Sequence, residues 1–439
     1  MNALRVHYSA FDVVPSPKGA STHITWFVRG LVAAGANVDL VTVGDGLLPA
    51  LGAHAGASVH RIGRAAADTF LGRALEFGDA VVQRLERAGQ GAYELCHFRN
   101  AWCGLPIVEA AQRLGYRTVF EVNGLPSVEL KYHYPALRGS ASLERIRQRE
   151  ILPLLQADAV LCPSRVTAAF LESLGVEPER LTVIPNGMEP SLFRATALPA
   201  ARSPARLLYV GTLAEWQGLS VLLKALAVVR REVPAELYIL GSGRERQRRR
   251  LLRAAERLGL AGAVFLEAPV VHEQVPEWIA AADVCVAPLG YNERNVTQGC
   301  CPLKVIEYLA CARPVVAANL PVVRELLRDG IEGLLFEPDN ADELGHKLLS
   351  VLRDRELAER LALAGARRAH AEFSWSTAQR RLLTLYEGLL RRSLSAAADQ
   401  TLQQGEIGGA LARQAEGAQR PLASPAPELG RELGRGEHT

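Results

Sequence analysis

Short apolar runs alternate with longer amphipathic stretches along the first part of the chain. The runs are rich in β-branched and aromatic residues, which is typical of strands that are buried on both faces. The expected strands are 6–8, 38–43, 95–98, 118–122, 159–162 and 181–184. The expected helices are 21–34, 66–88, 103–114, 141–156 and 165–174. Strands and helices in alternation predict a parallel sheet that is covered by helices on both faces.

A second series of the same kind follows a segment that contains prolines and alanines but has no hydrophobic period. Its expected strands are 207–210, 237–240, 264–266, 284–287, 314–317 and 333–336. Its expected helices are 218–231, 244–258, 274–281, 302–311, 321–328, 341–353 and 355–370. The predicted fold class is therefore α/β, with two doubly wound, Rossmann-like domains that face a cleft.

The same pattern predicts the domain boundaries. We expect an N-terminal domain over 1–193, a linker over 194–205 and a C-terminal domain over 206–376. The apolar face of a helix over 377–392 has to cover a core, and the N-terminal domain is the expected partner. Residues 393–439 contain no aromatic side chain and are expected to form a disordered tail.

Composition changes this picture little. The chain has 439 residues, with 50 Lys and Arg against 47 Asp and Glu, so nucleic acid is not an expected partner. The seven cysteines are odd in number and lie mostly in apolar stretches, which is typical of reduced thiols in a cytoplasm. The adjacent Cys300 and Cys301 lack a second pair at zinc-finger spacing, so no metal site is expected. The chain shows neither a secretory signal nor 18 consecutive apolar residues, so we expect a cytoplasmic protein.

Candidate chemistry lies in the loops at the carboxyl ends of the strands, where doubly wound sheets bind their ligands. Lys18 and Gly19 precede a predicted helix, where a cation and exposed amides can hold a phosphate or an acceptor hydroxyl. An ordinary strand-to-helix turn is the alternative explanation. His97 and Asn123 follow two other strands at the same edge, and Gly211 opens a glycine turn in the second series.

The segment 298–317 is the most informative part of the sequence. Pro302 stands where a helix begins, so the amides of Leu303 and Lys304 are free donors at its N-terminus. Glu307 follows about one turn later among apolar residues, where a buried carboxylate needs donors such as sugar hydroxyls. The alternative explanation is that Glu307 only stabilises the helix, because the helix dipole favours a negative charge near the N-terminus.

Taken together, these motifs resemble those of the retaining family 4 glycosyltransferases of GT-B fold. The residues that carry the resemblance are IPNG at 184–187, YVGTL at 209–213, LGSG at 240–243, ADVCVAP at 282–288 and PLKVIEYLA at 302–310, with PVVA at 314–317. The resemblance spans about residues 5–392. It implies hexosyl or N-acetylhexosaminyl transfer from a nucleotide diphosphate sugar, as co-substrate, to a hydroxyl acceptor, with retention and no cofactor or metal.

The resemblance also implies a biological setting and a role for Glu307. The setting is the synthesis of a surface polysaccharide or glycolipid, with a saccharide or lipid-linked acceptor and peripheral association with the inner face of the cell membrane. Glu307 matches the second Glu of the family's Glu, seven residues, Glu motif, and would bind the ribose hydroxyls of the donor.

The chain departs from the family pattern at the positions of several usual ligands. Gly299 stands where the motif's first Glu contacts the donor sugar, and Asn123 stands where a His is common. Thr212 and Gln217 replace the Arg and Lys that usually hold the diphosphate. Lys304 is expected to supply the missing charge.

The candidate residues fall into groups by expected role. The catalytic candidates are Lys304, Asn123 and His97. The donor-binding candidates are Glu307, Leu303, Gly211, Thr212, Gln217, Gln298, Gly299 and Val271, with Gln298 expected to replace the lost sugar contact. Lys18 and Gly19 form the candidate acceptor or phosphate loop.

Two other functions fit the same sequence. A non-catalytic subunit would bind a nucleotide sugar without turnover, which the missing ligands favour. A sugar-nucleotide epimerase of related fold would use the same cleft with acid and base carboxylates and a histidine, and would convert the donor in the absence of any acceptor.

Overall fold

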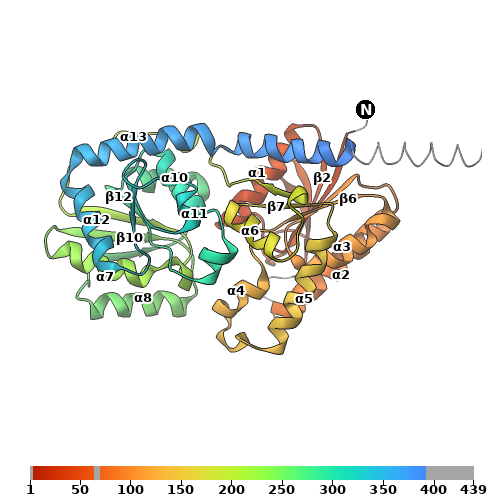
Figure 1. Ribbon diagram of the computed structural model, residues 1–439, viewed down its shortest axis with the longest axis horizontal. Helices are drawn as coiled ribbons and strands as arrows, with labels where there is room; N and C mark the ends of the chain where they lie inside the picture. The colour runs from red at the N-terminus through yellow and green to blue at the C-terminus, as the bar shows by residue number, and fades with distance from the viewer. Residues whose placement is uncertain (1–2, 64–69, 392–439) are drawn as a thin grey trace, which may run out of the picture. The chain divides into compact units, whose positions relative to one another are not determined.

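The computed structural model describes residues 3–63 and 70–391 of the chain (Figure 1). Residues up to Leu389 belong to one compact unit, which contains two separate β-sheets. The predicted tail, 393–439, lies outside the described residues, as do residues 66–69 of one predicted helix. The predicted α/β class with two doubly wound sheets is confirmed.

The first sheet has the strand order β3-β4-β2-β1-β5-β6-β7-β8. All neighbouring strands are parallel except β3 and β4, which are antiparallel. The strands are β1 (Arg5–Ala10), β2 (Asn37–Val43), β3 (Leu51–His54), β4 (Ala57–Ile62), β5 (Leu95–Phe98), β6 (Arg117–Glu121), β7 (Ala159–Cys162) and β8 (Leu181–Val183). The strand order reverses direction at β1, so the carboxyl ends of β1 and β5 border the crevice where ligands bind in such sheets.

Helices connect these strands and cover the sheet. They are α1 (Gly19–Ala33), α2 (Phe70–Ala88), α3 (Ala101–Leu114), α4 (Pro126–His133), α5 (Ala141–Gln156) and α6 (Arg165–Ser173). The apolar faces of α2 and α3 pack together and on the sheet, with Phe77, Val81 and Ile107 fully buried. Gly115 ends α3 in the left-handed conformation, as expected for a glycine after a helix.

The second sheet is entirely parallel, with the order β11-β10-β9-β12-β13-β14. Its strands are β9 (Ala205–Val210), β10 (Ala235–Leu240), β11 (Val264–Glu267), β12 (Val284–Ala287), β13 (Val315–Ala318) and β14 (Leu334–Phe336). Its helices are α7 (Leu219–Arg230), α8 (Glu245–Arg257), α9 (Val275–Ala280), α10 (Leu303–Ala310), α11 (Pro321–Arg324), α12 (Ala341–Arg353) and α13 (Arg355–Glu372).

The sequence pattern missed four elements. The strands β3 and β4 form a hairpin at the sheet edge, and β3 is mostly exposed, so it has no apolar run to reveal it. Helix α4 begins at Pro126 and buries only two side chains, so it has no helical hydrophobic period. A π-helical turn, η5 (Arg294–Gln298), precedes α10 in a segment for which the sequence predicted no strand or helix.

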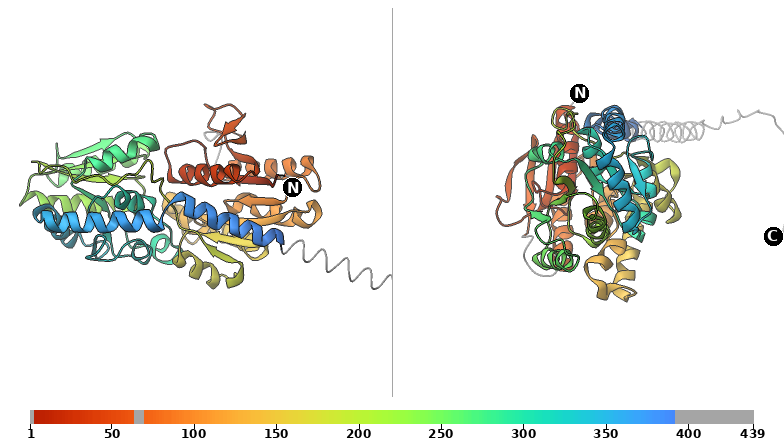
Figure 2. Two further views of the ribbon diagram at one scale, coloured as in Figure 1. Left: turned by 90° about the horizontal axis from the view of Figure 1, so that it is seen from above. Right: turned by 90° about the vertical axis from the view of Figure 1, so that its left-hand side faces the viewer.

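A last helix, 375–391, leaves the second sheet and lies along the first one (Figures 1 and 2). Its Gln379 amide donates to the Trp26 carbonyl of α1 over 2.7 Å, and a Cβ on Gly30 would collide with the same Gln379 side chain. Leu382, Tyr386 and Leu389 are buried. This helix therefore supplies part of the covering layer of the first sheet.

Candidate functional site

The main cavity lies between the carboxyl ends of the two sheets. Its volume is about 810 Å³, and residues of both sheets' loops line it. The N-termini of α1 and α10 both reach it, and a Cβ on Gly19 of α1 would come 3.8 Å from the Leu303 side chain of α10. Amides at two helix N-termini thus face one space, which favours an anionic ligand.

Lys304 is held in the wall of this cavity by two contacts, one from strand β9 and one from the loop after it. Its Nζ donates to Gln217 Oε1 over 2.7 Å and lies 3.9 Å from the centre of the Tyr209 ring. A Cβ on Gly211 would come 2.8 Å from the same nitrogen, so the glycine leaves room for it. Burial lowers the pKa of Lys304 to about 7. None of the carboxylates that the structure describes is bound to this ammonium, and an arriving anion would stabilise its charged form.

Glu307 lies one turn further along α10 and is almost fully buried. His272 Nε2 is 2.7 Å from Glu307 Oε1, and both residues line the cavity. Burial by itself lowers the pKa of His272, but the hydrogen bond and negative charge of Glu307 outweigh it and raise the pKa. One of the donors that Glu307 needs is therefore supplied by the protein, and the carboxylate still faces the cavity.

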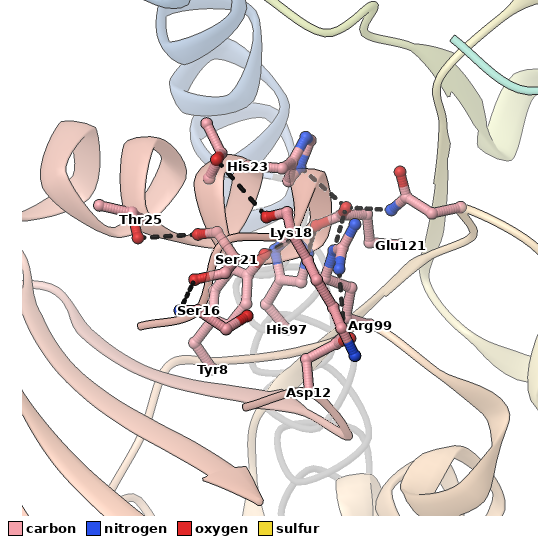
Figure 3. A network of polar contacts seen from close by, with 12 residues as sticks. Tyr8, Asp12, Ser16, Lys18, Ser21, His23, Thr25, His97, Arg99 and Glu121 are labelled. Atoms are coloured by element: carbon pink, nitrogen blue, oxygen red, sulfur yellow. Dashed lines mark hydrogen bonds and ion pairs between the residues drawn. The ribbon is translucent and has the colours of Figure 1, made fainter. Parts of the chain in front are cut away.

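Five side chains converge on a second carboxylate, Glu121, at the end of β6 (Figure 3). Oε2 is contacted by Tyr8 Oη at 2.7 Å and by His97 Nε2 at 3.0 Å. Oε1 is contacted by Arg99 Nε at 2.9 Å, by His23 Nε2 at 2.8 Å and by Asn123 Nδ2. Burial alone raises the pKa of Glu121, but His23, Arg99 and the hydrogen bonds hold it well below its usual range. Glu121 is thus an anchored anion.

The buried network around Glu121 also fixes the state of His97. Burial lowers the pKa of His97, which favours the neutral ring. Its Nε2 faces the carboxylate and must carry the proton, so Nδ1 accepts from the Tyr386 hydroxyl over 2.6 Å. Both ring nitrogens of His97 are therefore occupied by protein groups.

Asn186, in the IPNG turn after β8, joins the two halves of the cavity. Its Oδ1 lies 2.7 Å from His23 Nδ1, and its Nδ2 donates to the Cys301 carbonyl over 2.7 Å. The Cys301 carbonyl lies just before α10, so the turn holds the start of that helix against the Glu121 network.

The structure brings most of the predicted site residues to the cavity. The ones that line it are Lys304, Asn123, Glu307, Leu303, Gly211, Thr212, Gln217, Lys18 and Gly19. Cys300 and Cys301 are free, buried thiols as expected, and they also line it. No described residues form a cluster of His, Cys, Asp or Glu that could hold a metal ion.

Four predicted site residues do not line the cavity. His97 is completely buried behind Glu121 rather than on the rim, because β5 ends inside the network. Gln298 is also buried, and its Oε1 accepts from the Leu125 amide over 2.8 Å. Gly299 is buried against α6, where a Cβ would come 2.7 Å from Thr167 Oγ1. Val271 is 59% exposed, and the next residue, His272, reaches the cavity instead.

Sequence reasoning missed several cavity residues that are polar or charged. They are Asp12, His23, Arg99, Glu129, His133, Arg244 and His272. His272 directly follows Val271, which was predicted as a donor-binding residue, so the sequence already pointed to this loop. Glu129 and His133 lie on α4, whose sequence gave no helical pattern, and His23 and Arg99 acquire their role only through Glu121.

Comparisons with known proteins agree with this geometry. A family profile described as "Glycosyl transferases group 1" matches residues 204–354, and one described as "Glycosyltransferase Family 4" matches residues 17–192. Together they cover most of the chain and most of both sheets. The chain belongs to the family 4 glycosyltransferases.

This glycosyltransferase is similar to known proteins along most of its length. A D-inositol 3-phosphate glycosyltransferase from Thermobispora bispora is 27% identical over 416 residues, which cover 89% of this chain and 94% of the relative. Among solved structures, sucrose-phosphate synthase from Thermosynechococcus elongatus matches with a TM-score of 0.75 and 22% identity, over 90% of this chain and 100% of the other. HepE from Anabaena, in complex with UDP and glucose, matches with a TM-score of 0.68 and 18% identity, over 88% and 100%. These two likenesses confirm the GT-B fold.

The glycosyltransferase has no helix, among the residues that the structure describes, with the length and apolarity needed to cross a membrane.

Proposed function

We propose that this glycosyltransferase moves a hexosyl or N-acetylhexosaminyl group from a nucleotide diphosphate sugar to a hydroxyl acceptor, with retention and without a metal ion. The observation that carries the proposal is the placement of Lys304 and Glu307 on one helix whose N-terminus faces the cavity. The helix amides and the Lys304 ammonium suit the diphosphate. The Glu307 carboxylate, about one turn deeper, suits the ribose hydroxyls.

In the proposed reaction, the bond between the anomeric carbon and the diphosphate oxygen breaks, and its electron pair stays on the diphosphate. The acceptor oxygen bonds to the same face of the sugar, and its proton moves to the leaving phosphate oxygen. Lys304 and the α10 amides stabilise the growing negative charge, which is the role of preorganised donors in such sites. Glu121 holds its partners His23, Arg99 and Asn123 rigidly at the floor of the cavity.

We assign the donor to the second sheet's side of the cavity and the acceptor to the first sheet's side. A uridine nucleotide is our first choice of donor, since the HepE structure holds UDP. On the acceptor side, Phe11, Trp102 and Tyr134 line the cavity, as does Lys18, and aromatic faces suit the apolar face of a sugar or cyclic polyol ring. The Thermobispora bispora relative is named for an acceptor of this kind, an inositol phosphate.

The proposal includes a role in the synthesis of a surface polysaccharide or glycolipid. A lipid-linked acceptor would require peripheral contact with a membrane. Co-sedimentation with vesicles that contain or lack the lipid-linked acceptor would test this part separately from the chemistry.

The first experiment is a thermal-shift panel of UDP-, GDP- and ADP-sugars with the full-length protein. A ligand at 100 times its Kd stabilises the fold by about 2.7 kcal/mol, so a cognate donor is easily detected. The donor that binds is then incubated with saccharide and polyol acceptors with and without EDTA, and NMR reports the anomeric configuration of the product. An inverted product contradicts retention, and loss of activity in EDTA contradicts metal independence.

The non-catalytic alternative remains favoured by one observation, the neutral Thr212 and Gln217 at positions that are usually charged. It predicts donor binding without product for every acceptor. The epimerase alternative predicts that the sugar of the donor changes in the absence of any acceptor. The NMR spectrum of the donor alone would then show the resonances of a second, epimeric sugar.

A further inference from the structure

Glu129 lies on the first sheet's side of the molecule but contacts the second sheet's side. It belongs to α4, and its Oε1 accepts from Arg294 Nε over 2.9 Å in the π-helical turn η5. Both side chains line the cavity and are partly exposed to it, at 28% and 17%. No residue that the structure describes donates to the second carboxylate oxygen, Oε2. One oxygen is thus anchored, and the other is left as an acceptor on a side chain that lines the cavity.

The surroundings of Glu129 are shaped to hold this carboxylate. A Cβ on Gly124, in the loop after β6, would come 2.4 Å from Glu129 Oε1, so a larger residue there would displace the carboxylate from this position. The buried Gln298 accepts from the Leu125 amide and turns its Nε2 toward Glu129 Oε1 at 3.4 Å. Arg294 is itself stacked 4.9 Å from the centre of the Trp216 ring. The carboxylate is therefore positioned by groups from both halves of the cavity.

The contacts around Glu129 locate it between the two proposed substrates. Its partner Arg294 is stacked on Trp216, and the next residue in the chain, Gln217, accepts from Lys304 Nζ over 2.7 Å. Glu129 itself belongs to α4 on the first sheet's side, and it lines the cavity together with the Lys18 loop. The sugar that is transferred must occupy the space between the proposed diphosphate and acceptor positions.

We propose that Glu129 recognises the transferred sugar, by accepting hydrogen bonds from its hydroxyl groups with the oxygen that Arg294 leaves free. This inference rests on the proposed function and adds the group that determines which sugar is accepted. Gly299 cannot carry such a group, because its φ of 81° and its contact with α6 exclude a side chain. The acidic contact comes instead from the opposite side of the cavity.

The test compares Glu129→Gln with a matched control, Glu293→Gln. Glu293, the residue before η5, pairs with Lys131 of α4 and so joins the same two parts of the chain, but it does not line the cavity. Calorimetry measures the affinity of the full-length proteins for UDP-glucose and UDP, GDP-mannose and GDP, and ADP-glucose and ADP. We expect Glu129→Gln to lower the affinity for the nucleotide sugar that the wild type binds by tenfold or more. The affinity for the corresponding sugar-free diphosphate should stay within twofold of the wild-type value. Glu293→Gln should leave both affinities within twofold.

The outcomes separate this inference from the function on which it rests. A wild type that binds none of these nucleotides overturns the proposed function, and the role of Glu129 with it. If the wild type prefers a nucleotide sugar over its diphosphate and the Glu129→Gln variant keeps the same preference, only the role of Glu129 is overturned. Equal weakening of sugar and diphosphate by Glu129→Gln and Glu293→Gln would also overturn it, because Glu129 would then act only by holding α4 on η5.

Discussion

The Tyr386 hydroxyl lies 2.6 Å from Nδ1 of His97, although 289 residues separate them in the sequence. The contact joins the last described helix to the end of β5, and through His97 to the Glu121 carboxylate. The final helix therefore closes the polar network under the cavity as well as covering the first sheet.

Tyr386→Phe should destabilise the fold by about 1–3 kcal/mol, because it leaves the buried Nδ1 of His97 without a donor. Urea unfolding followed by circular dichroism measures the change. Tyr291→Phe is the control, since Tyr291 is 67% exposed and the loss of its hydroxyl should change stability by less than about 0.5 kcal/mol. Equal stability of the two variants would show that the hydroxyl contributes nothing to the network.

The sequence predicted the buried strands because each is a near-continuous apolar run between turn residues. It failed at β3 and α4 for the opposite reason. The β3 strand is mostly exposed and is held by pairing with β4, while α4 is held by ion pairs from Glu129 and Lys131 to η5. Elements that are held by strand pairing or by ion pairs, rather than by burying an apolar face, leave no local hydrophobic period.

Some residues of the candidate site could likewise be predicted from the sequence and others could not. Lys304 and Glu307 were predicted because both lie on one helix, where proline, spacing and helix geometry fix their relation. The role of Glu121 depends on side chains from β1, α1, β5 and the loop after β6, which no spacing in the sequence brings together. His97 was misplaced because a strand end can lie on the rim or beneath it, and only the packing of Tyr386 decides which.

Glu307→Ala should weaken binding of the nucleotide-sugar donor by about 1.5–3 kcal/mol for each charge-assisted hydrogen bond to the ribose that it removes. The fold should remain intact, because Glu307 lies at the cavity wall. Calorimetry with the donor found in the thermal-shift panel measures the loss. Unchanged affinity would remove Glu307 from the donor site.

The raised pKa of His272 predicts a pH dependence of stability. Its folded pKa lies above the unfolded value of 6.5, so the pair with Glu307 stabilises the fold fully below about pH 6.5. This contribution disappears as the pH rises through the folded pKa. Glu307→Gln should lower the pKa of His272 and remove this dependence. Histidine NMR titration follows the pKa directly, and an unchanged midpoint in the variant would contradict the assignment.

Gly299→Glu should not restore the acid that the family motif has at this position. The φ of 81° disfavours any side chain, and the new Cβ would lie 2.8 Å from the Thr167 backbone nitrogen. We expect Gly299→Ala and Gly299→Glu each to destabilise the fold by about 1–3 kcal/mol or more. The control is Gly388→Ala in the last helix, where a Cβ meets no atom within 4 Å and should stabilise by about 0.5–1 kcal/mol. A stable, more active Gly299→Glu would refute this account.

Lys304 should take up a proton when the donor binds. Its pKa of about 7 leaves the amine mostly neutral at about pH 8, and a bound diphosphate favours the ammonium. Calorimetry in buffers of different ionisation enthalpy should therefore show uptake close to one proton at about pH 8 and little below pH 6. Lys304→Met should abolish the uptake, and an unchanged value in this variant would mean that another group titrates.

The same lysine connects stability with catalysis. Between about pH 7 and 10.5 the unfolded lysine keeps a proton that the folded one has lost, so wild-type stability should rise with pH over this window. Lys304→Met should flatten that rise and be more stable than the wild type below about pH 7.

Lys304→Met should also turn over more slowly than the wild type. Its turnover should fall by a larger factor than its donor affinity, because the ammonium stabilises the charge that grows on the leaving phosphate. Single-turnover kinetics at saturating donor measure this difference. Rates within twofold of wild type for Lys304→Met and Lys304→Ala would assign the diphosphate to other cations of the cavity, with Arg294 and Lys18 the next to substitute.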